Sequence, residues 1–130
     1  MKSVVVTGAN RGIGLELCKQ FLAKGNRVFA TYRSNKGELK TIENTNLSTF
    51  KLDVRDADEL ESFASSIEGS VDILINNAGI ADGRWQSISE INMQHAIEVI
   101  EVNSIAPVLV TQKFENKLKP GSKIVMMSSL

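Results

Sequence analysis

Short apolar runs recur along the chain, and each has the composition of a buried β-strand. Val and Ile are frequent in them, and the first and fourth runs are apolar almost throughout. This pattern is typical of strands that are covered on both faces, because neither face meets water. The pattern predicts strands at residues 3–8, 27–33, 48–54, 71–77 and 122–129.

Between the runs, apolar residues recur at the spacing of three and four that is typical of amphipathic helices. The segment 34–47 is short and polar, and a short helix is expected there. The other segments predict buried stripes made of Ile13, Leu17 and Phe21 with Leu15, Cys18 and Leu22 beside them; of Leu60, Phe63, Ala64 and Ile67; and of Met93, Ala96, Ile97 and Ile100.

Strand and helix alternate along the whole chain, which favours βαβ units and a mainly parallel sheet. Right-handed crossovers place helices on both faces of such a sheet. We therefore expect an α/β fold, a Rossmann-like, doubly wound parallel sheet in three layers with strand order 3-2-1-4-5. Ligands bind these sheets at the carboxyl ends of the strands, so functional residues are expected directly after each strand.

Composition narrows the function without naming it. A net charge of +0 gives no reason to expect nucleic acid or an anionic membrane as a partner. Cys18 is the one cysteine, so no internal disulfide is possible, and a cytoplasmic location is expected. No apolar run approaches the ~20 residues of a membrane span, and there is no signal-peptide pattern. No group of side chains has the spacing of a metal site.

The turn after the first strand, TGANRGIG, predicts a phosphate-binding site. Gly8 permits a tight turn, Gly12 lets backbone N–H groups approach a pyrophosphate, and Gly14 allows the helix to pack closely on the strand. The alternative is a plain strand-to-helix turn that is capped by Asn10. The cofactor-binding residues predicted here are Gly8, Asn10, Arg11, Gly12, Ile13 and Gly14.

A second motif, NNAG at residues 76–79, follows the fourth strand, which is expected beside the first. Together, TGxxxGxG and NNAG resemble the short-chain dehydrogenase/reductase family, and the chain resembles its carbonyl-reductase-like and C-factor-like members. The resemblance implies that residues 1–130 form an NAD(P)-binding Rossmann domain, incomplete relative to the family. Asn77, Ala78 and Gly79 match the loop that passes under the ribose; alternatively, Asn77 merely ties neighbouring turns together.

The end of the second strand bears on the choice of cofactor. An acidic residue there would hydrogen-bond the adenosine ribose, but Tyr32 stands in that place and Arg33 follows it. Arg33 can donate charge-assisted hydrogen bonds to a 2′-phosphate, and Arg11, in the glycine turn, also favours a phosphate there. The family's NADP-using members resemble this arrangement, so we predict NADP(H) rather than NAD(H). The alternative leaves Arg33 as a solvated loop charge.

Asp53 and Val54 follow the third strand and match the family's contact with the adenine edge. The carboxylate of Asp53 could accept a hydrogen bond from the exocyclic amine. It could also cap the helix that begins near Asp56. Both interpretations stay open at this point.

Asn103 and Pro107 predict a break in the fourth helical segment. Asn103 is expected on the inward side of the helix, where a buried amide needs partners. Proline has no N–H for the carbonyl of Asn103, so that carbonyl is expected to be free, at a kink, where an ordered water could bind. In the family the matching Asn holds a water of a proton relay; a helix break with a structural Asn is the alternative.

Ser129 aligns with the family serine that hydrogen-bonds the substrate oxygen, and its neighbour Ser128 is expected to point to the opposite face. The family's general acid is a Tyr with a Lys four residues later, beyond the position of Leu130. Tyr32, the one tyrosine of this sequence, is expected at the adenine end of the site. The resemblance therefore implies the amino-terminal, NADP(H)-binding part of an enzyme that moves hydride between nicotinamide and a carbonyl or alcohol. These residues alone are expected to have little or no dehydrogenase activity.

Two other functions remain open: a dinucleotide-binding sensor, and an interaction module in which the Asn103 helix packs on a partner. The family resemblance implies a homo-oligomer, and the apolar fifth strand, an edge in the expected order, favours pairing with another chain. His95 is expected at the surface and Cys18 against the sheet. Trp85 could pack or border the substrate.

Overall fold

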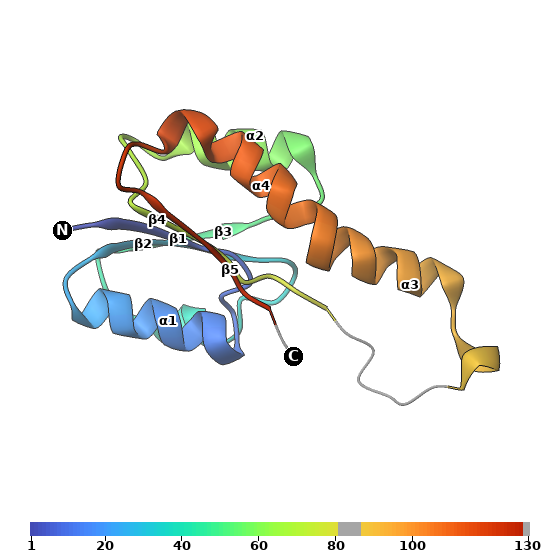
Figure 1. Cartoon of the computed structure of the whole chain (residues 1–130). Helices are drawn as coiled ribbons and strands as arrows, with labels where there is room; N and C mark the ends of the chain where they lie inside the picture. The colour runs from blue at the N-terminus through green and yellow to red at the C-terminus, as the bar shows by residue number, and fades with distance from the viewer. Residues whose placement is uncertain (81–86, 129–130) are drawn as a thin grey trace.

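A parallel five-stranded sheet forms the centre of the protein, with strand order β3-β2-β1-β4-β5 (Figure 1). The computed structural model describes residues 1–80 and 87–128. This architecture confirms the predicted doubly wound fold and its strand order. The strands are β1 (Ser3–Val6), β2 (Arg27–Tyr32), β3 (Leu47–Lys51), β4 (Ile73–Asn76) and β5 (Lys123–Met126).

Helices cover both faces of this sheet. Helix α1 lies on one face, and α2 and α4 lie on the other, while α3 extends from α4 beyond the edge of the sheet (Figure 1). The polar segment between β2 and β3 forms only a short 3₁₀ turn. The helices are α1 (Gly12–Ala23), α2 (Ala57–Ser66), α3 (Met93–Ile100) and α4 (Ala106–Phe114), and the 3₁₀ turns are Gly37–Thr41, Ile88–Glu90 and Glu115–Lys117. No described helix is long and apolar enough to cross a lipid bilayer.

The buried side of α1 differs from the prediction. Leu15, Cys18 and Leu22 are buried, whereas Ile13 is 62% exposed. The reason lies at the start of the helix. Gly14 packs against the backbone of the preceding turn, and residues four apart in an α-helix lie on the same face, so Cys18 and Leu22 face inward with Gly14. Of the row Ile13, Leu17 and Phe21, only Ile13 therefore faces solvent; Leu17 and Phe21 are half-buried and pack against the same core.

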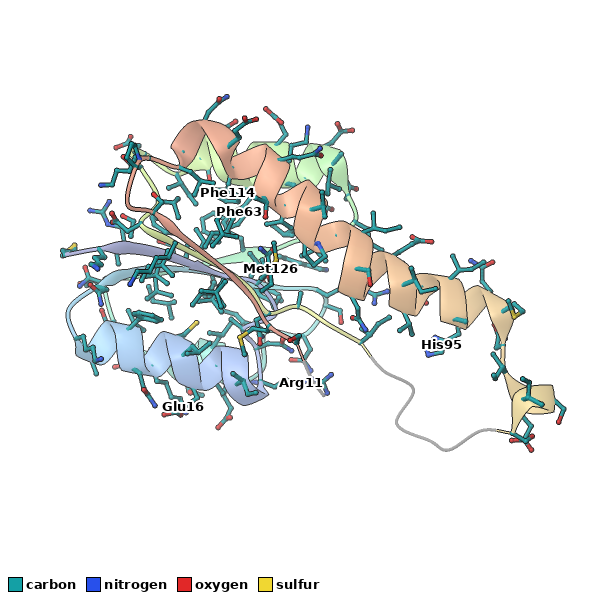
Figure 2. All side chains as sticks on the ribbon, viewed as in Figure 1. Arg11, Glu16, Phe63, His95, Phe114 and Met126 are labelled. Atoms are coloured by element: carbon teal, nitrogen blue, oxygen red, sulfur yellow. The ribbon has the colours of Figure 1, made fainter. Side chains whose placement is uncertain are left out.

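Helix α2 buries the predicted stripe. Leu60, Phe63, Ala64 and Ile67 all contribute to the core between this helix, α4 and the sheet. The rings of Phe63 and Phe114 meet edge to face, with centroids 5.5 Å apart (Figure 2). Aromatic pairs of this geometry add to the free energy gained by burial alone.

The predicted stripe on α3 is wrong as a buried surface. Met93 is 69% exposed and Ile100 is 56% exposed, because this helix runs past the sheet and meets no second layer among the described residues (Figure 1). The predicted open edge at β5 is confirmed, since β5 pairs only with β4 in the described sheet and Ile124 and Met126 are exposed.

The aromatic core gives a direct stability prediction. Replacing Phe114, which is fully buried, with Ala removes a ring that contacts Phe63, and we expect the free energy of unfolding to fall by about 3–5 kcal/mol. Val108→Ala on the exposed side of the same helix serves as control and is expected to change it by less than about 0.5 kcal/mol. Urea unfolding followed by circular dichroism measures both; equal losses would contradict the assignment of Phe114 to the core.

Candidate functional site

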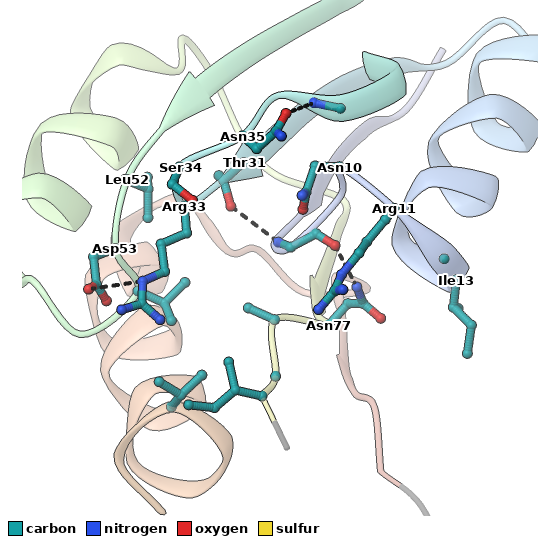
Figure 3. Close-up of a pocket in the computed structure, with 18 residues that line it drawn as sticks. Asn10, Arg11, Ile13, Thr31, Arg33, Ser34, Asn35, Leu52, Asp53 and Asn77 are labelled. Carbon is teal, nitrogen blue, oxygen red and sulfur yellow. Dashed lines mark hydrogen bonds and ion pairs between the residues drawn. The ribbon is translucent and has the colours of Figure 1, made fainter. Parts of the chain in front are cut away.

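A cleft of about 730 Å³ opens at the carboxyl ends of the strands, between the turns that follow β1, β2, β3 and β4 (Figure 3). The structure brings together the predicted cofactor residues there, except Gly14, which lies behind the cleft wall. Those that line the cleft are Gly8, Asn10, Arg11, Gly12, Ile13, Arg33, Asp53, Val54, Asn77, Ala78 and Gly79.

The cleft also contains residues that sequence reasoning did not single out. Ser34 and Asn35 follow Arg33, and their place just after the second strand could have identified them. Val102 comes from the helical segment before Asn103, and only the three-dimensional packing places it there. The additional lining residues are Thr31, Ser34, Asn35, Gly37, Leu52, Ile80 and Val102.

The glycine turn depends on close backbone contact with the turn after β4. Gly8 has a φ of 62°, and a Cβ atom built on it would lie 2.7 Å from Cα of Ala78. A Cβ atom on Gly14 would lie 2.5 Å from the carbonyl oxygen of Gly8 and would also meet the side-chain amide of Asn77. Both glycines are therefore required by packing.

Gly12 has a different role. Its φ is 58°, and a Cβ atom there would meet nothing within 4 Å, so its backbone faces open space at the start of α1. The N-cap of α1 is Arg11, and its side chain makes no capping hydrogen bond in the structure described. The interpretation of Asn10 as the cap is therefore wrong. Gly12 and Ile13, the first residues of α1, line the cleft, and no N-cap side chain accepts a hydrogen bond from the first N–H groups of the helix in the described part of the chain.

Thr7 links the two turns beneath the cleft. Its hydroxyl oxygen accepts hydrogen bonds from the backbone N–H groups of Asn77 and Ala78, both at 3.0 Å. The side-chain amide of Asn77 donates in return to the carbonyl oxygens of Thr7 and Gly8, at 3.2 and 3.0 Å. Asn77 thus ties the neighbouring turns together, which is one of the two interpretations drawn from the sequence. The residue also lines the cleft.

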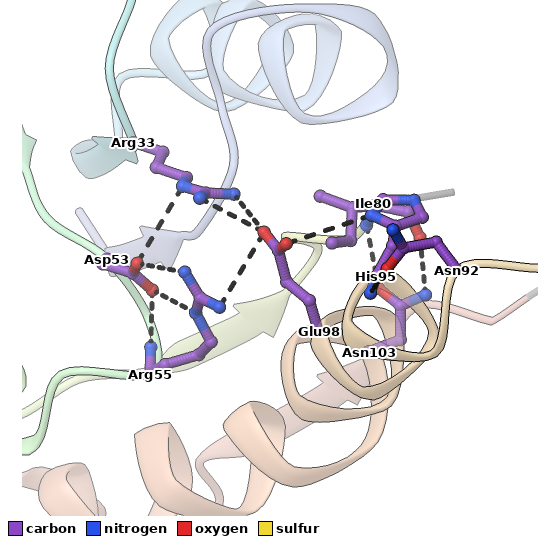
Figure 4. Close-up of polar contacts among 8 residues, drawn as sticks. All are labelled: Arg33, Asp53, Arg55, Ile80, Asn92, His95, Glu98 and Asn103. Atoms are coloured by element: carbon purple, nitrogen blue, oxygen red, sulfur yellow. Dashed lines mark hydrogen bonds and ion pairs between the residues drawn. The ribbon is translucent and has the colours of Figure 1, made fainter. Parts of the chain in front are cut away.

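Four charged side chains form a ring at the end of the cleft that lies beyond β2 and β3 (Figure 4). Asp53 accepts from Arg55 through both carboxylate oxygens, at 3.0 and 2.7 Å. Arg33 lies between Asp53 and Glu98: its Nε is 3.9 Å from Asp53 Oδ2, and both its Nη atoms donate to Glu98 Oε1 at 3.3 Å. Arg33 thus has ion-pair partners, but its side chain is 53% exposed, so the alternative interpretation as a solvated loop charge stays open.

Asp53 does not cap α2. The N-cap of that helix is Asp56, whose side chain accepts from the N–H of Glu59. Asp53 is instead held by Arg55, and hydrogen bonds from the Arg55 side chain lower the pKa of its carboxyl group below the ordinary value. A carboxylate that stays ionised and faces the cleft can accept hydrogen bonds from a ligand.

Asn103 lies in a π-helical turn, Glu101–Ile105, between α3 and α4. The N–H of Ala106 bonds the carbonyl of Glu101, a wider spacing than in an α-helix, so the predicted irregularity takes the form of a π turn beside Pro107. The predicted burial of Asn103 is wrong: the residue is exposed, because no layer of the residues in 1–80 and 87–128 packs over this side of the helix. Its side-chain amide instead pairs with Ile80, accepting from the backbone N–H at 2.8 Å and donating to the carbonyl at 2.7 Å.

The remaining candidates fall into two groups. Ser129 and Trp85 lie outside the described residues, so their predicted roles stay predictions. His95 lies on α3 away from the sheet, with its Nδ1 3.9 Å from Glu98 Oε2 (Figure 2). Cys18 is fully buried against the sheet, and burial raises the pKa of its thiol to about 12, so the thiol stays protonated.

The profile of the short chain dehydrogenase family matches residues 2–130, nearly the whole chain. The chain belongs to the short-chain dehydrogenase family. Human retinol dehydrogenase 11 is 36% identical over 141 aligned residues, which cover 99% of this chain and 43% of that protein. The NADPH-dependent 3-dehydrocapnine reductase of Ornithobacterium rhinotracheale is 31% identical, over 99% of this chain and 50% of that protein. The chain thus spans about half the length of these curated relatives.

Solved structures of the family agree with the fold. The crystal structure of NADPH-bound carbonyl reductase from chicken fatty liver superposes with a TM-score of 0.85 at 34% identity, covering 99% of this chain and 57% of that one. A carbonyl reductase from Pseudomonas aeruginosa PAO1 superposes with a TM-score of 0.89 at 30% identity, covering 99% of this chain and 62% of that one. The fold and strand order are therefore those of a short-chain dehydrogenase.

The hydroxyl of Thr7 gives a testable prediction for this site. Thr7→Val keeps the shape but removes the acceptor, which leaves the N–H groups of Asn77 and Ala78 without their partner. We expect the free energy of unfolding to fall by about 1–3 kcal/mol. Thr7→Ser, which keeps the hydroxyl, is the control and should lose less. If both variants unfolded at the same urea concentration, the hydroxyl would not hold the turns.

The ion pair of Asp53 predicts a pH dependence. Because its pKa is lowered in the folded chain, Asp53 contributes stability that is fully present above its ordinary pKa of ~3.9, and this contribution is lost as the pH falls below that value and through the lowered pKa of the folded chain. Arg55→Leu should raise the pKa of Asp53 and move the acid unfolding midpoint to higher pH. Carboxyl ¹³C NMR measures the pKa. Lys51→Leu, a charge loss on the exposed side of β3, should leave it unchanged.

Proposed function

We propose that this chain is the NADP(H)-binding portion of a short-chain oxidoreductase that transfers hydride between the nicotinamide and a carbonyl or alcohol. The observation that carries this proposal is the meeting of Arg11 and Arg33 in one cleft, at the start of α1 and just beyond β2. An adenosine 2′-phosphate is the part of NADP(H) that NAD(H) lacks, and guanidinium groups are its natural partners.

The residues present fit a dinucleotide along the cleft. The pyrophosphate would bind at the start of α1, where the first N–H groups and the helix dipole favour an anion and Gly12 leaves room for it. The adenine would lie beside Asp53 and Val54, and the ribose that carries the nicotinamide beside Asn77, Ala78 and Gly79. The bound cofactor supplies the hydride; the residues named here bind and orient it.

Two relatives support NADP(H) over NAD(H). The chicken liver carbonyl reductase carries NADPH in its crystal structure, and the O. rhinotracheale reductase is named as NADPH-dependent. Both exceed 30% identity over nearly the whole of this chain. Their names also favour reduction of a small carbonyl substrate by the whole protein.

On the catalytic side, we propose that Ser129 binds the substrate oxygen and that Asn103 belongs to a proton relay. The pairing of the Asn103 amide with Ile80 leaves its main chain, in the π turn, as the part available to a water. The expectation that these residues alone turn over little substrate stays a prediction. It rests on the general acid of the family, which is a Tyr, whereas Tyr32 is the last residue of β2, at the adenosine end. A cytoplasmic, homo-oligomeric parent enzyme is part of the same proposal.

The proposal is tested by the relative affinity of the chain for NADPH and NADH, measured by isothermal titration calorimetry. We expect NADPH to bind more tightly, and Arg33→Leu to weaken NADPH at least about tenfold, the size of a charge-assisted phosphate contact, with NADH little changed. Arg27→Leu is the matched control. Arg27 is the first residue of β2, so it lies at the amino end of the strand, away from the cleft at the carboxyl ends, and its loss should affect neither ligand.

Other outcomes would contradict the proposal. Equal affinity for the two cofactors, or an equal loss of both in Arg33→Leu, would remove the assignment of Arg33 to a 2′-phosphate. Absence of binding to either cofactor, in a chain that is folded by circular dichroism, would remove the dinucleotide site itself.

A further inference from the structure

We infer that Glu98 is a specificity-determining residue that competes with the 2′-phosphate of NADP(H) for Arg33. This inference rests on the proposed function, since it concerns the same cleft. In the ring of charges, Glu98 reaches from α3 across to the turn after β2 and holds the guanidinium of Arg33 (Figure 4). The carboxylate therefore occupies the donors that a phosphate would use.

The geometry identifies the hydrogen-bond donors of Arg33 for which Glu98 and a phosphate would compete. Nη1 and Nη2 of Arg33 both donate to the same oxygen, Glu98 Oε1, at 3.3 Å. Charge-assisted hydrogen bonds of full strength are shorter, about 2.7–2.9 Å, and a phosphate engages an arginine through two separate oxygens. The contact with Glu98 is therefore a long one that a phosphate can replace by two better bonds.

Asp53, the other acid of the ring, is not the competitor. Both of its oxygens accept from the side chain of Arg55, at 3.0 and 2.7 Å, and the backbone N–H of Arg55 adds a bond of 2.9 Å. Its distance to Arg33 is 3.9 Å. Asp53 is committed to Arg55, so Glu98 is the acid that must release Arg33.

The charges of the ring explain why Glu98 affects the affinity for NADP(H). Arg33 and Arg55 balance Asp53 and Glu98, so the formal charges of the four side chains cancel. A 2′-phosphate brings up to about two further negative charges beside Glu98, and like charges at this distance repel. Glu98 is 30% exposed, so its carboxylate can turn to water, but Arg55 at 3.8 Å attracts it to the ring, and Nδ1 of His95 lies 3.9 Å from its other oxygen. Full engagement of Arg33 by the 2′-phosphate of NADP(H) then requires displacement of this carboxylate, whereas NAD(H) has no phosphate to place there.

The test is a double-mutant cycle with calorimetric titration of NADPH and NADH. Glu98→Gln keeps the size of the side chain and removes its charge, and we expect NADPH to bind about threefold to fivefold more tightly, the scale of one part-exposed ion pair. NADH should change by less than twofold. In the Arg33→Leu background, the same Glu98→Gln substitution should no longer improve NADPH binding beyond its effect on NADH.

A matched control is Glu90→Gln, which removes one negative charge from an exposed 3₁₀ turn of the same connection and should leave both affinities unchanged. If Glu98→Gln left NADPH binding unchanged or weakened it, while Arg33 still distinguished NADPH from NADH, the competition would be wrong and the proposed function would stand. If the unsubstituted chain did not prefer NADPH, both would be wrong. Improvement of NADPH and NADH by the same factor would show a general charge effect and overturn the assignment to the 2′-phosphate.

Discussion

The arrangement of the whole cleft depends on one close approach, between the turn after β1 and the turn after β4. Thr7 accepts the N–H groups of Asn77 and Ala78, and Gly8 brings its backbone against Ala78 at a distance that no side chain would allow. Since β1 and β4 are parallel neighbours, their carboxyl ends coincide, and this contact sets the depth of the cleft floor. A ligand that lies across the floor meets backbone and small side chains from both turns at once.

Beyond that floor, the cleft is shaped by charge. In dinucleotide folds an acid after the second strand discriminates against a 2′-phosphate, and here the position holds Tyr32 with Arg33 beside it. The ring nevertheless contains two acids, supplied by the turn after β3 and by α3, so positive charge is balanced locally. Under the proposed competition, Arg33 would exchange Glu98 for a phosphate, whereas Arg55 holds Asp53 and lowers the pKa of its carboxyl group. The two arginines thus have separate tasks although they share one ring.

Much of this could be predicted from the sequence, because a parallel sheet leaves a strong pattern. The apolar runs predicted the strands and their order. The motifs after the strands predicted 11 of the 18 residues that line the cleft (Figure 3). Glu98 and Val102 were not predicted, because they come from a helix whose approach to the cleft depends on tertiary packing. The cap at Asn10 was wrong for a local reason: the N-cap lies one residue later, at Arg11, whose backbone is extended, and the helix begins at Gly12.

The exposed stripe of α3 was the largest error, and its cause is general. Hydrophobic periodicity indicates that a helix face is covered by something, but it does not say what covers it. In this chain α3 extends past the sheet, so Met93, Ile97 and Ile100 are exposed. The π turn is fixed independently of any cover, because the Asn103 amide pairs with both backbone groups of Ile80. The π turn at the end of α3 is therefore anchored to the segment after β4, while the apolar face of α3 is left uncovered by the part of the chain that the structure describes.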